Sequence, residues 1–413
     1  MSGLRLATDI GGTFTDTVLA SSDGIVLGSA KTPTTPTAPA LGALAGARIV
    51  LEGHSFGNVT GFVHGTTLAT NALIERRGAV VATLTNAGFR DILEIAYERR
   101  YDQYAIDLEK PDLIVPRERA FTIDGRMDVT GAEVAPVDLG AVPGLVAALR
   151  AAGVEALAVC LLHSYANGAH ELAVREALAR EMPELVVSLS HEISPEAREF
   201  DRLCTTIANA YIQPLLAEYL ADFEARFRAE GLACPILMMT ASGGMTTFDI
   251  AAKIPVRLVE SGPAGGAILA AEVARGIGAE DVLSFDMGGT TAKLCLIDGF
   301  KPQTARSFEI ARAARFLKGS GMPVRIPVTE MIEIGAGGGS QARVDRLGRI
   351  QVGPESAGSE PGPVAFGKGG DVPTVTDADV AMGFIDPGRV AEGRLGINLA
   401  AAEAALARDL GLD

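Results

Sequence analysis

The chain has 413 residues, of which 48% are hydrophobic and 21% charged, and it contains no tryptophan. This length is sufficient for two or three domains with substantial cores. The formal net charge of −15 would repel nucleic acids and anionic membrane surfaces, so we expect neither of them as a partner.

Other bulk features point to a protein of the cytoplasm. The residues before the first predicted strand do not resemble a signal peptide, and no apolar run approaches the roughly 18 residues of a membrane span. The four cysteines are widely separated and have no zinc-finger spacing, so we expect them to be mostly buried thiols. These observations predict a cytoplasmic location.

The predicted elements of the first half alternate between strands and helices. Residues 4–10 and 16–20 predict a hairpin, and residues 31–39, with three prolines and four threonines, predict a loop. Further on we expect a helix at 38–52, a strand at 79–85, a helix at 143–152, a strand at 154–162, a helix at 168–181 and a strand at 185–190. This alternation indicates an α/β layer.

A long helix opens the second half. Ser194, Pro195 and Glu196 predict its start, because serine caps a helix and proline suits its first turn. Pro214 is expected to kink or restart it before it ends near residue 229. We place the domain boundary at this helix, which gives domains of 1–193 and 194–413. Beyond it we expect strands at 235–240 and 282–286, much loop over 318–370, and a helix at 399–410.

One short motif occurs twice. Residues 9–16 read Asp-Ile-Gly-Gly-Thr-Phe-Thr-Asp, and residues 286–293 read Asp-Met-Gly-Gly-Thr-Thr-Ala-Lys. Each copy lies between two short apolar runs, which predicts a strand, a glycine-rich turn and a second strand. Two such turns can face each other across a cleft and grip the phosphates of one nucleotide. The repeat therefore predicts a protein that uses ATP.

The residue types in these turns suit phosphate and magnesium. Glycines let a ligand approach the main-chain amides, and threonine hydroxyls add donors. Carboxylates at strand ends suit Mg²⁺, so we expect Asp9 and Asp286 to be metal ligands and catalytic residues. The candidate phosphate-binding residues of the two turns are Gly11, Gly12, Thr13, Thr15, Gly288, Gly289, Thr290, Thr291 and Lys293.

A further glycine-rich segment lies at 335–340. Through Gly337 and Gly338 it could bind nucleotide, or it could act as a hinge. The segment does not complete a G-x-G-x-x-G pattern, and the chain has no G-x-x-x-x-G-K-[ST] sequence. A P-loop is therefore excluded, and a dinucleotide-binding fold is disfavoured.

Paired Asp-x-Gly-Gly-Thr turns resemble those of the actin and sugar-kinase ATPase superfamily. The chain as a whole resembles the A subunit of the hydantoinase/oxoprolinase family. The motifs that carry this resemblance follow the family's order and lie at 9–16, 63–71, 261–266, 285–293, 334–340, 352–358 and 373–379. The resemblance implies an α/β fold with a duplicated ribonuclease-H-like (actin-like ATPase) core and inserted α/β elements.

The resemblance also implies an activity. It is the ATP-dependent hydrolysis of a small cyclic amide or imide, such as a hydantoin or 5-oxoproline, with ATP phosphorylating the amide oxygen. It implies Mg²⁺ and a B-type subunit as partner in a hetero-oligomer. Residues 63–71 would line the substrate cleft, with His64 binding substrate or assisting proton transfer. The other substrate contacts would be Thr66, Thr67 and Asn71. The alternative for this segment is a helix cap in which His64 has only structural hydrogen bonds.

Alternatives remain open. Some relatives serve in ATP-dependent carboxylases of ketones. Subunits of this family usually continue for a few hundred residues more, and no second stretch like the superfamily's adenosine-binding motif follows Gly370. The chain could therefore be a fragment, a split subunit or a catalytically incompetent partner protein.

Overall fold

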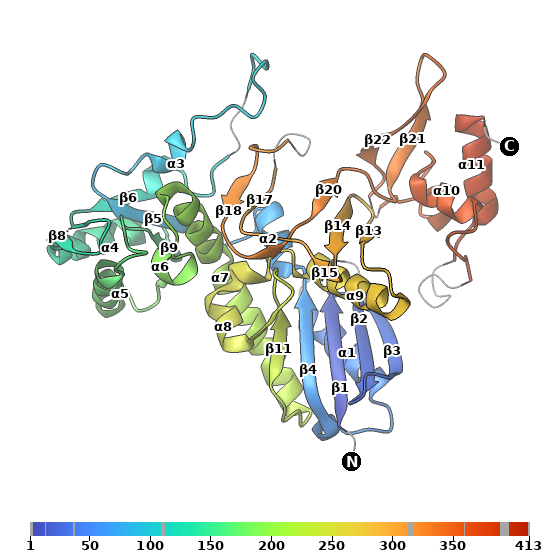
Figure 1. The fold of residues 1–413 in the computed structure, drawn as a ribbon, viewed down its shortest axis with the longest axis horizontal. Helices are drawn as coiled ribbons and strands as arrows, with labels where there is room; N and C mark the ends of the chain where they lie inside the picture. The colour runs from blue at the N-terminus through green and yellow to red at the C-terminus, as the bar shows by residue number, and fades with distance from the viewer. Residues whose placement is uncertain are drawn as a thin grey trace. The chain divides into compact units, whose positions relative to one another are not determined.

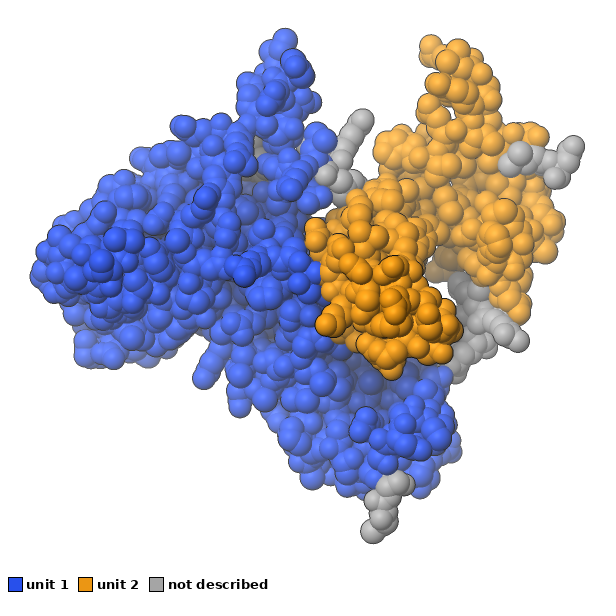
Figure 2. Space-filling model, in the orientation of Figure 1, with its two compact units in different colours: residues 1–265, 304–329 blue, residues 266–303, 330–413 orange. Residues whose placement is uncertain are grey.

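The computed structural model describes residues 3–12, 14–35, 38–108, 112–312, 317–358, 360–388 and 396–411. They form a mixed α/β protein with several sheets (Figure 1). Two compact units divide the chain (Figure 2): unit 1 holds residues 1–265 and 304–329, and unit 2 holds residues 266–303 and 330–413. The division falls inside helix α9 (Ser261–Ile277). These compact units are not the predicted sequence domains, so the domain boundary predicted near residue 194 stays a prediction.

A six-stranded sheet in unit 1 carries the first copy of the repeat. Its order is β12-β11-β4-β1-β2-β3. The strands are β1 (Leu4–Ile10), β2 (Phe14–Ser21), β3 (Val26–Pro33), β4 (Val59–Thr66), β11 (Ile236–Met239) and β12 (Met245–Thr247). The predicted hairpin at 4–20 is confirmed, whereas the loop predicted from residue 31 begins inside β3. Buried and exposed residues alternate along β1, because successive side chains of a strand point to opposite faces.

Two helices pack on this sheet. Helix α1 (Pro39–Val50) contacts β2 and β3 through small residues, and a Cβ added at Gly42 would lie 3.2 Å from Thr15 Oγ1. Helix α7 (Glu199–Ala229) stacks aromatic rings against β4, with the Phe62 and Phe223 centroids 5.8 Å apart. The glycines of α1 thus allow a close approach that larger side chains would prevent.

Helix α7 begins five residues later than the predicted Ser194, so that prediction is wrong. Ser194 instead ends α6 (Ser190–Ile193), and its hydroxyl donates to the Arg325 carbonyl at 3.1 Å. Arg198, with φ of 78°, precedes the first helical residue. Pro214 lies within one continuous 31-residue helix.

The second sheet of unit 1 is entirely parallel, in the order β10-β9-β5-β6. Its strands are β5 (Val81–Asn86), β6 (Ala120–Ile123), β9 (Ala156–Val159) and β10 (Val186–Leu189). Every residue of β5 and β9 is buried, as is typical of parallel strands covered on both faces. The predicted α/β layer is confirmed here, with helices α4 (Val142–Ala151) and α5 (Ala169–Glu181).

The short elements of unit 1 complete its description. The helices are α2 (Leu68–Ile74), α3 (Ile92–Ile95) and α8 (Phe248–Lys253). The strand pairs are β7 (Arg126–Met127) with β8 (Glu133–Ala135), β16 (Thr304–Ala305) with β19 (Val328–Thr329), and β17 (Phe308–Ile310) with β18 (Met322–Val324).

Unit 2 carries the second copy of the repeat. Its strands are β13 (Val282–Met287), β14 (Ala292–Asp298), β15 (Lys301–Pro302) and β20 (Ile332–Ile334), followed by the hairpin of β21 (Ser340–Val344) and β22 (Ile350–Ser356). Helices α10 (Val375–Ala381) and α11 (Leu399–Leu410) come last. The expectation that much of 318–370 is loop is confirmed, although the described part of this region also holds five short strands. The helix predicted at 399–410 is confirmed.

Two further expectations can be compared with the described residues. All four cysteines are buried and free, as predicted. Within the described ranges, no helix combines the length and the apolar character that crossing a membrane requires.

Candidate functional site

The two glycine-rich turns close in the same way. The Gly11 amide donates to the Phe14 carbonyl at 3.0 Å, and the Gly288 amide donates to the Thr291 carbonyl at 2.9 Å. The backbone φ angle is not positive at any of the four turn glycines, which are Gly11, Gly12, Gly288 and Gly289. The repeat is therefore structural as well as sequential, with one copy in each unit. A left-handed backbone does not explain these glycines; at Gly11 an added Cβ would lie 3.1 Å from the Phe14 carbonyl oxygen, whereas at Gly289 it would meet nothing within 4 Å.

Asp9 lies at the end of β1 beside the first turn. Across the hairpin it is paired with Asp16, and on its other side it is in register with Gly65 of β4. A Cβ added at Gly65 would lie 2.8 Å from Asp9 Oδ1, so the missing side chain makes room for the carboxylate. Loss of solvating water around the Asp9 carboxylate raises its pKa, and the negative charge of Asp16 raises it further. The positive charge of Lys31 lowers it. Lys31 pairs with Asp16 at 2.7 Å.

Thr15 supports the first turn from the core side. It is fully buried, and its hydroxyl lies 3.1 Å from that of Thr34, which donates to the Gly11 carbonyl at 2.9 Å. Sequence reasoning did not single out Thr34, although the threonine-rich stretch that contains it was noted. Thr13, the other threonine predicted in this turn, lies outside the described residues.

The 63–71 segment also lies against the first turn. The Thr67 hydroxyl donates to the Ile10 carbonyl at 3.3 Å and accepts from Asn71 Nδ2 at 3.2 Å. A Cβ added at Gly12 would lie 3.9 Å from the same Asn71 nitrogen. Thr66 is buried and accepts from the Leu68 amide at 3.2 Å. The structure thus brings Thr67 next to Ile10 and Asn71 next to Gly12 at the first turn.

His64 is fully buried beneath this region. Its Nδ1 lies 2.8 Å from Thr8 Oγ1 and its Nε2 lies 2.5 Å from the Tyr219 hydroxyl, while its ring stacks on Phe223 at 4.2 Å between centroids. Burial lowers the pKa of His64 to about 3, so the ring is neutral at physiological pH. Because both of its ring nitrogens are hydrogen-bonded inside the core, His64 holds β4, β1 and α7 together. Its ring is not accessible for proton transfer to a substrate.

The second turn is held from behind by the glycine-rich segment 335–340 of the same unit. The Gly338 amide donates to the Gly288 carbonyl at 2.9 Å, and the Gly339 amide donates to the Gly289 carbonyl at 2.7 Å. The Gly337 amide donates to Ser340 Oγ at 2.9 Å. Because these amides already have partners, we assign Gly337 and Gly338 to shaping the turn and not to contacting phosphate.

Two carboxylates end the strands that lead into the turns. Asp286 is exposed and stands across the hairpin from Lys293, as Asp9 stands across from Asp16. Among the described residues, no three or more His, Cys, Asp or Glu side chains form a group that could hold a metal by themselves. Magnesium, however, commonly uses one or two carboxylates, several waters and the substrate's phosphates. The neighbouring carboxylates of Asp9 and Asp16, with the raised pKa of Asp9, fit such an ion.

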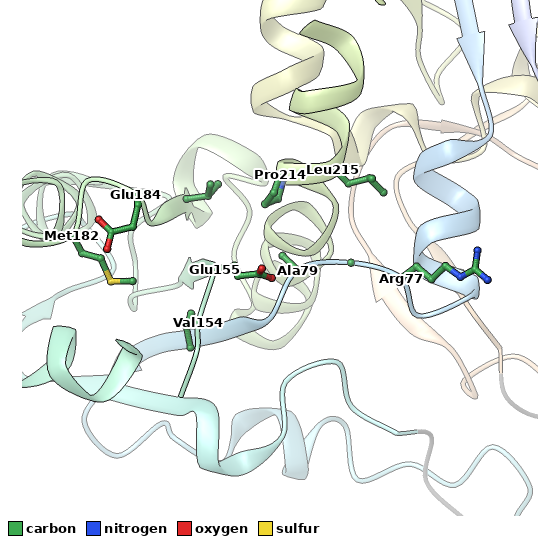
Figure 3. A pocket seen from close by; sticks show the side chains of 10 residues that line it. Arg77, Ala79, Val154, Glu155, Met182, Glu184, Pro214 and Leu215 are labelled. Carbon is green, nitrogen blue, oxygen red and sulfur yellow. The ribbon is translucent and has the colours of Figure 1, made fainter. Parts of the chain in front are cut away.

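Two recesses lie in unit 1 away from the predicted site residues. One, of about 500 Å³, is lined by Val154, Met182, Leu215 and neighbouring residues (Figure 3). Its Glu155 carboxylate is already engaged, because it accepts from the Val80 amide at 2.8 Å. The other recess, of about 1440 Å³, includes Leu73, Arg76, Ile95 and Tyr97. Helix α2 connects this larger recess to the first turn, since Asn71 lies beside Gly12 and Leu73 lines the recess.

The fold and the duplicated turns define an α/β protein of the actin-like ATPase type. Two solved structures support this class. An ATP-dependent caprolactamase from Pseudomonas jessenii aligns with a TM-score of 0.82 at 33% identity, over 99% of this chain and 60% of that one. Nucleotide-free acetone carboxylase aligns with a TM-score of 0.77 at 25% identity, over 100% of this chain and 59% of that one.

The chain belongs to the hydantoinase/oxoprolinase family. Residues 5–182 match the hydantoinase/oxoprolinase N-terminal region, and residues 202–411 match the hydantoinase/oxoprolinase model. Among its relatives, the caprolactamase subunit alpha of Pseudomonas jessenii is 33% identical over 96% of this chain and 57% of its own length. The 5-oxoprolinase 1 of Arabidopsis thaliana is 32% identical over 93% of this chain and 32% of its own length. This chain therefore spans less than two thirds of each relative.

Proposed function

We propose that this chain is the ATP-binding part of an enzyme that hydrolyses a small cyclic amide or imide, acting with a B-type subunit. The observation that carries the proposal is the pair of identically closed glycine turns, each next to a strand-end aspartate. The names of two relatives, ATP-dependent caprolactamase and 5-oxoprolinase, support the reaction class. ATP, when bound, supplies the phosphoryl group that activates the amide oxygen.

The residues of the chain have separate tasks in this proposal. Asp9, with Asp16 beside it, holds Mg²⁺ at the first turn, and Asp286 has the corresponding position at the second. Open backbone at Gly11, Gly12, Gly288 and Gly289 admits phosphate. The Thr290 and Thr291 hydroxyls donate hydrogen bonds to it, and the Lys293 ammonium offsets its charge. Thr15, Thr34, Thr67 and Asn71 keep the first turn in place, while His64 fixes the strands beneath it.

We place the organic substrate in the larger recess of unit 1. Its lining joins apolar groups such as Leu73 and Ile95 with polar groups such as Glu98 and Arg99, which suits a small lactam ring. Ile95 is 54% exposed, so a larger side chain there can fill the recess without disturbing the core. Ile95→Trp should raise KM for the amide and leave the affinity for ATP unchanged. An unchanged KM for the amide would show that the substrate binds outside this recess.

A second candidate is an ATP-dependent ketone carboxylase subunit. It is favoured by the acetophenone carboxylase gamma subunit of Aromatoleum aromaticum, which is 33% identical over 98% of this chain and 57% of its own length. The two reactions separate in one assay with the B-type subunit present. Lactam-dependent phosphate release identifies the hydrolase, and bicarbonate incorporated into a ketone identifies the carboxylase. If the assay shows neither reaction, the chain is instead a catalytically incompetent partner protein.

The magnesium and phosphate roles are tested with two carboxylate substitutions. Asp9→Asn and Asp286→Asn should each abolish Mg²⁺-dependent ATP turnover while the protein stays folded. Asp298→Asn, at the far end of β14, is the matched control and should turn over ATP normally. Normal turnover in both site variants would refute the proposed site.

A further inference from the structure

A strained β-turn lines the larger recess of unit 1. It consists of residues 95–98, and the Glu98 amide donates to the Ile95 carbonyl at 3.1 Å. Ala96 has φ of 50° and ψ of −128°, which are typical of the first central residue of a type II′ turn. Glycine is the usual residue at that position, because a Cβ is strained there. The backbone therefore holds Ala96 in a conformation that alanine normally avoids.

Strained backbone is concentrated around this recess. In the described chain, eight residues other than glycine have a positive φ, and four of them line the recess, namely Arg76, Ala96, Glu98 and Ala311. Such conformations persist only where the surrounding structure enforces them, and they cluster at functional sites. The recess is therefore a candidate ligand site on grounds that are independent of its size.

Tyr97, the second central residue of the turn, is held firmly by its neighbours. Its hydroxyl donates to the Asp201 carboxylate, whose other oxygen accepts from Arg325 Nε at 2.7 Å. The Phe200 ring meets the Tyr97 ring at a steep angle, with centroids 5.0 Å apart. Loss of solvating water, together with the bond to Asp201, raises the pKa of Tyr97 to about 12. The phenol therefore stays protonated and keeps this bond at physiological pH.

The fixed tyrosine ring in turn positions Arg99. The centre of the Arg99 guanidinium lies 5.2 Å from the centroid of the Tyr97 ring, within the range of a cation–π interaction. Arg117 of the same recess is paired with the Asp91 carboxylate at 2.6 Å. Arg99 has no carboxylate or carbonyl partner among the described residues. Its N–H groups are therefore available to a ligand in the recess.

A guanidinium held in this way suits a carboxylate ligand. Its planar fork of N–H groups can bind both carboxylate oxygens through parallel hydrogen bonds. Acidic side chains such as Glu98 and Glu118 also line the recess, so its net charge does not select an anion. The selection comes from Arg99, because its guanidinium is both positioned and unpaired.

We propose that the cyclic amide bound in the larger recess carries a carboxylate, that Arg99 binds this carboxylate, and that Tyr97 is the positioning residue for Arg99. The substrate class is then a lactam with an acidic substituent and not an unsubstituted lactam. This inference rests on the proposed function, because it takes a cyclic amide as the substrate.

The test compares two compounds that share one lactam ring. 5-Oxoproline carries a carboxylate on the ring, and 2-pyrrolidone does not. Each is titrated calorimetrically into the full chain at about pH 7 without ATP. We expect 5-oxoproline to bind about tenfold or more tightly than 2-pyrrolidone, as one charge-assisted hydrogen bond would give.

Matched variants assign the preference to named residues. Arg99→Gln should abolish the preference for 5-oxoproline and leave the affinity for 2-pyrrolidone unchanged. Tyr97→Leu, which removes the ring under Arg99, should do the same, whereas Tyr97→Phe keeps the ring and should retain part of the preference. The controls are Arg77→Gln and Tyr104→Leu, which change exposed residues outside the lining of this recess and should behave like the native chain.

The possible failures are distinct from one another. Equal affinity for the two compounds would overturn the inference while the proposed function stands. A preference that survives Arg99→Gln would move the carboxylate to another residue, and one that survives Tyr97→Leu would remove the positioning role. Binding of neither compound to the native chain would overturn the placement of the substrate in this recess, and the inference with it.

Discussion

Gly65→Ala tests how tightly Asp9 is positioned. Gly65 and Gly61 both lie on β4 in register with β1, opposite Asp9 and Arg5 respectively. An added Cβ at Gly65 would meet Asp9 Oδ1 at 2.8 Å, but at Gly61 it would meet only Arg5 Cγ at 4.0 Å. The same substitution on the same strand therefore presses on the carboxylate in one case and not in the other.

The expected magnitudes separate function from stability. The contact at Gly65 must open from 2.8 Å to at least the 3.4 Å of ordinary van der Waals contact, and the exposed carboxylate can do so by rotating. An off-rotamer side chain costs about 0.5–1.5 kcal/mol, which is small against a domain's stability of about 5–15 kcal/mol. A displacement of about 1 Å in a catalytic group, however, can cost about 100-fold in rate.

The assay compares Gly65→Ala with Gly61→Ala. We expect Gly65→Ala to lose about 100-fold in Mg²⁺-dependent ATP turnover with a melting temperature close to that of Gly61→Ala. Calorimetric titration of Mg²⁺-ATP gives a second reading that does not require the partner subunit, and it should weaken in the same variant alone. Equal turnover and equal binding in the two variants would refute the placement of Mg²⁺ at Asp9.

Three further predictions follow from the structure. The raised pKa of Asp9 means that its ionisation opposes folding, so its stability contribution is full below the unfolded pKa of about 3.9 and is lost as pH rises through the folded pKa. Asp9→Asn should therefore melt higher than the native protein at about pH 7, and the gain should vanish near about pH 3; a lower melting temperature at both pH values would contradict this sign. The His64 ring should show no NMR titration between about pH 5 and 8. Acid should destabilise the fold as pH falls from the unfolded pKa of about 6.5 toward the folded pKa of about 3. A titration midpoint of the ring near about 6.5 would show instead that the ring is in solvent. Gly337→Ala should lower the free energy of unfolding in urea by about 1–3 kcal/mol, because its Cβ would lie 2.7 Å from backbone atoms of Gly288, Gly289 and Thr290. Gly289→Ala, whose Cβ meets nothing within 4 Å, is the control, and equal stability of the two would show that the 335–340 segment does not press on the turn.

Local sequence predicted those parts of the fold whose cause is local. The hairpin at 4–20 is readable because a short apolar run lies on each side of a glycine-rich turn. The terminal helix at 399–410 follows from alanine and leucine at helical spacing. Where a distant residue takes part, the same reasoning fails: Ser194 looks like a cap, but it bonds to Arg325, which is 131 residues away.

The candidate site shows the same division. The Asp-x-Gly-Gly-Thr repeat identified both turns and the aspartates beside them, because the predicted phosphate binding would need particular residue types in a short stretch. Spacing could not show that His64 is buried between Thr8 and Tyr219, since those partners lie 56 residues before it and 155 after it. Nor could it show that Gly337 and Gly338 have their amides engaged by Ser340 and the second turn.

The sequence by itself therefore determined that this chain has two glycine-rich turns of the same motif and which residue types they offer. The tertiary structure alone decided which of those groups are already hydrogen-bonded within the protein. It also showed that the apolar side of β13 is open where the matching side of β1 is buried. The physical reason is that both strands carry apolar residues in the same alternation, while burial depends on which other segments pack against them.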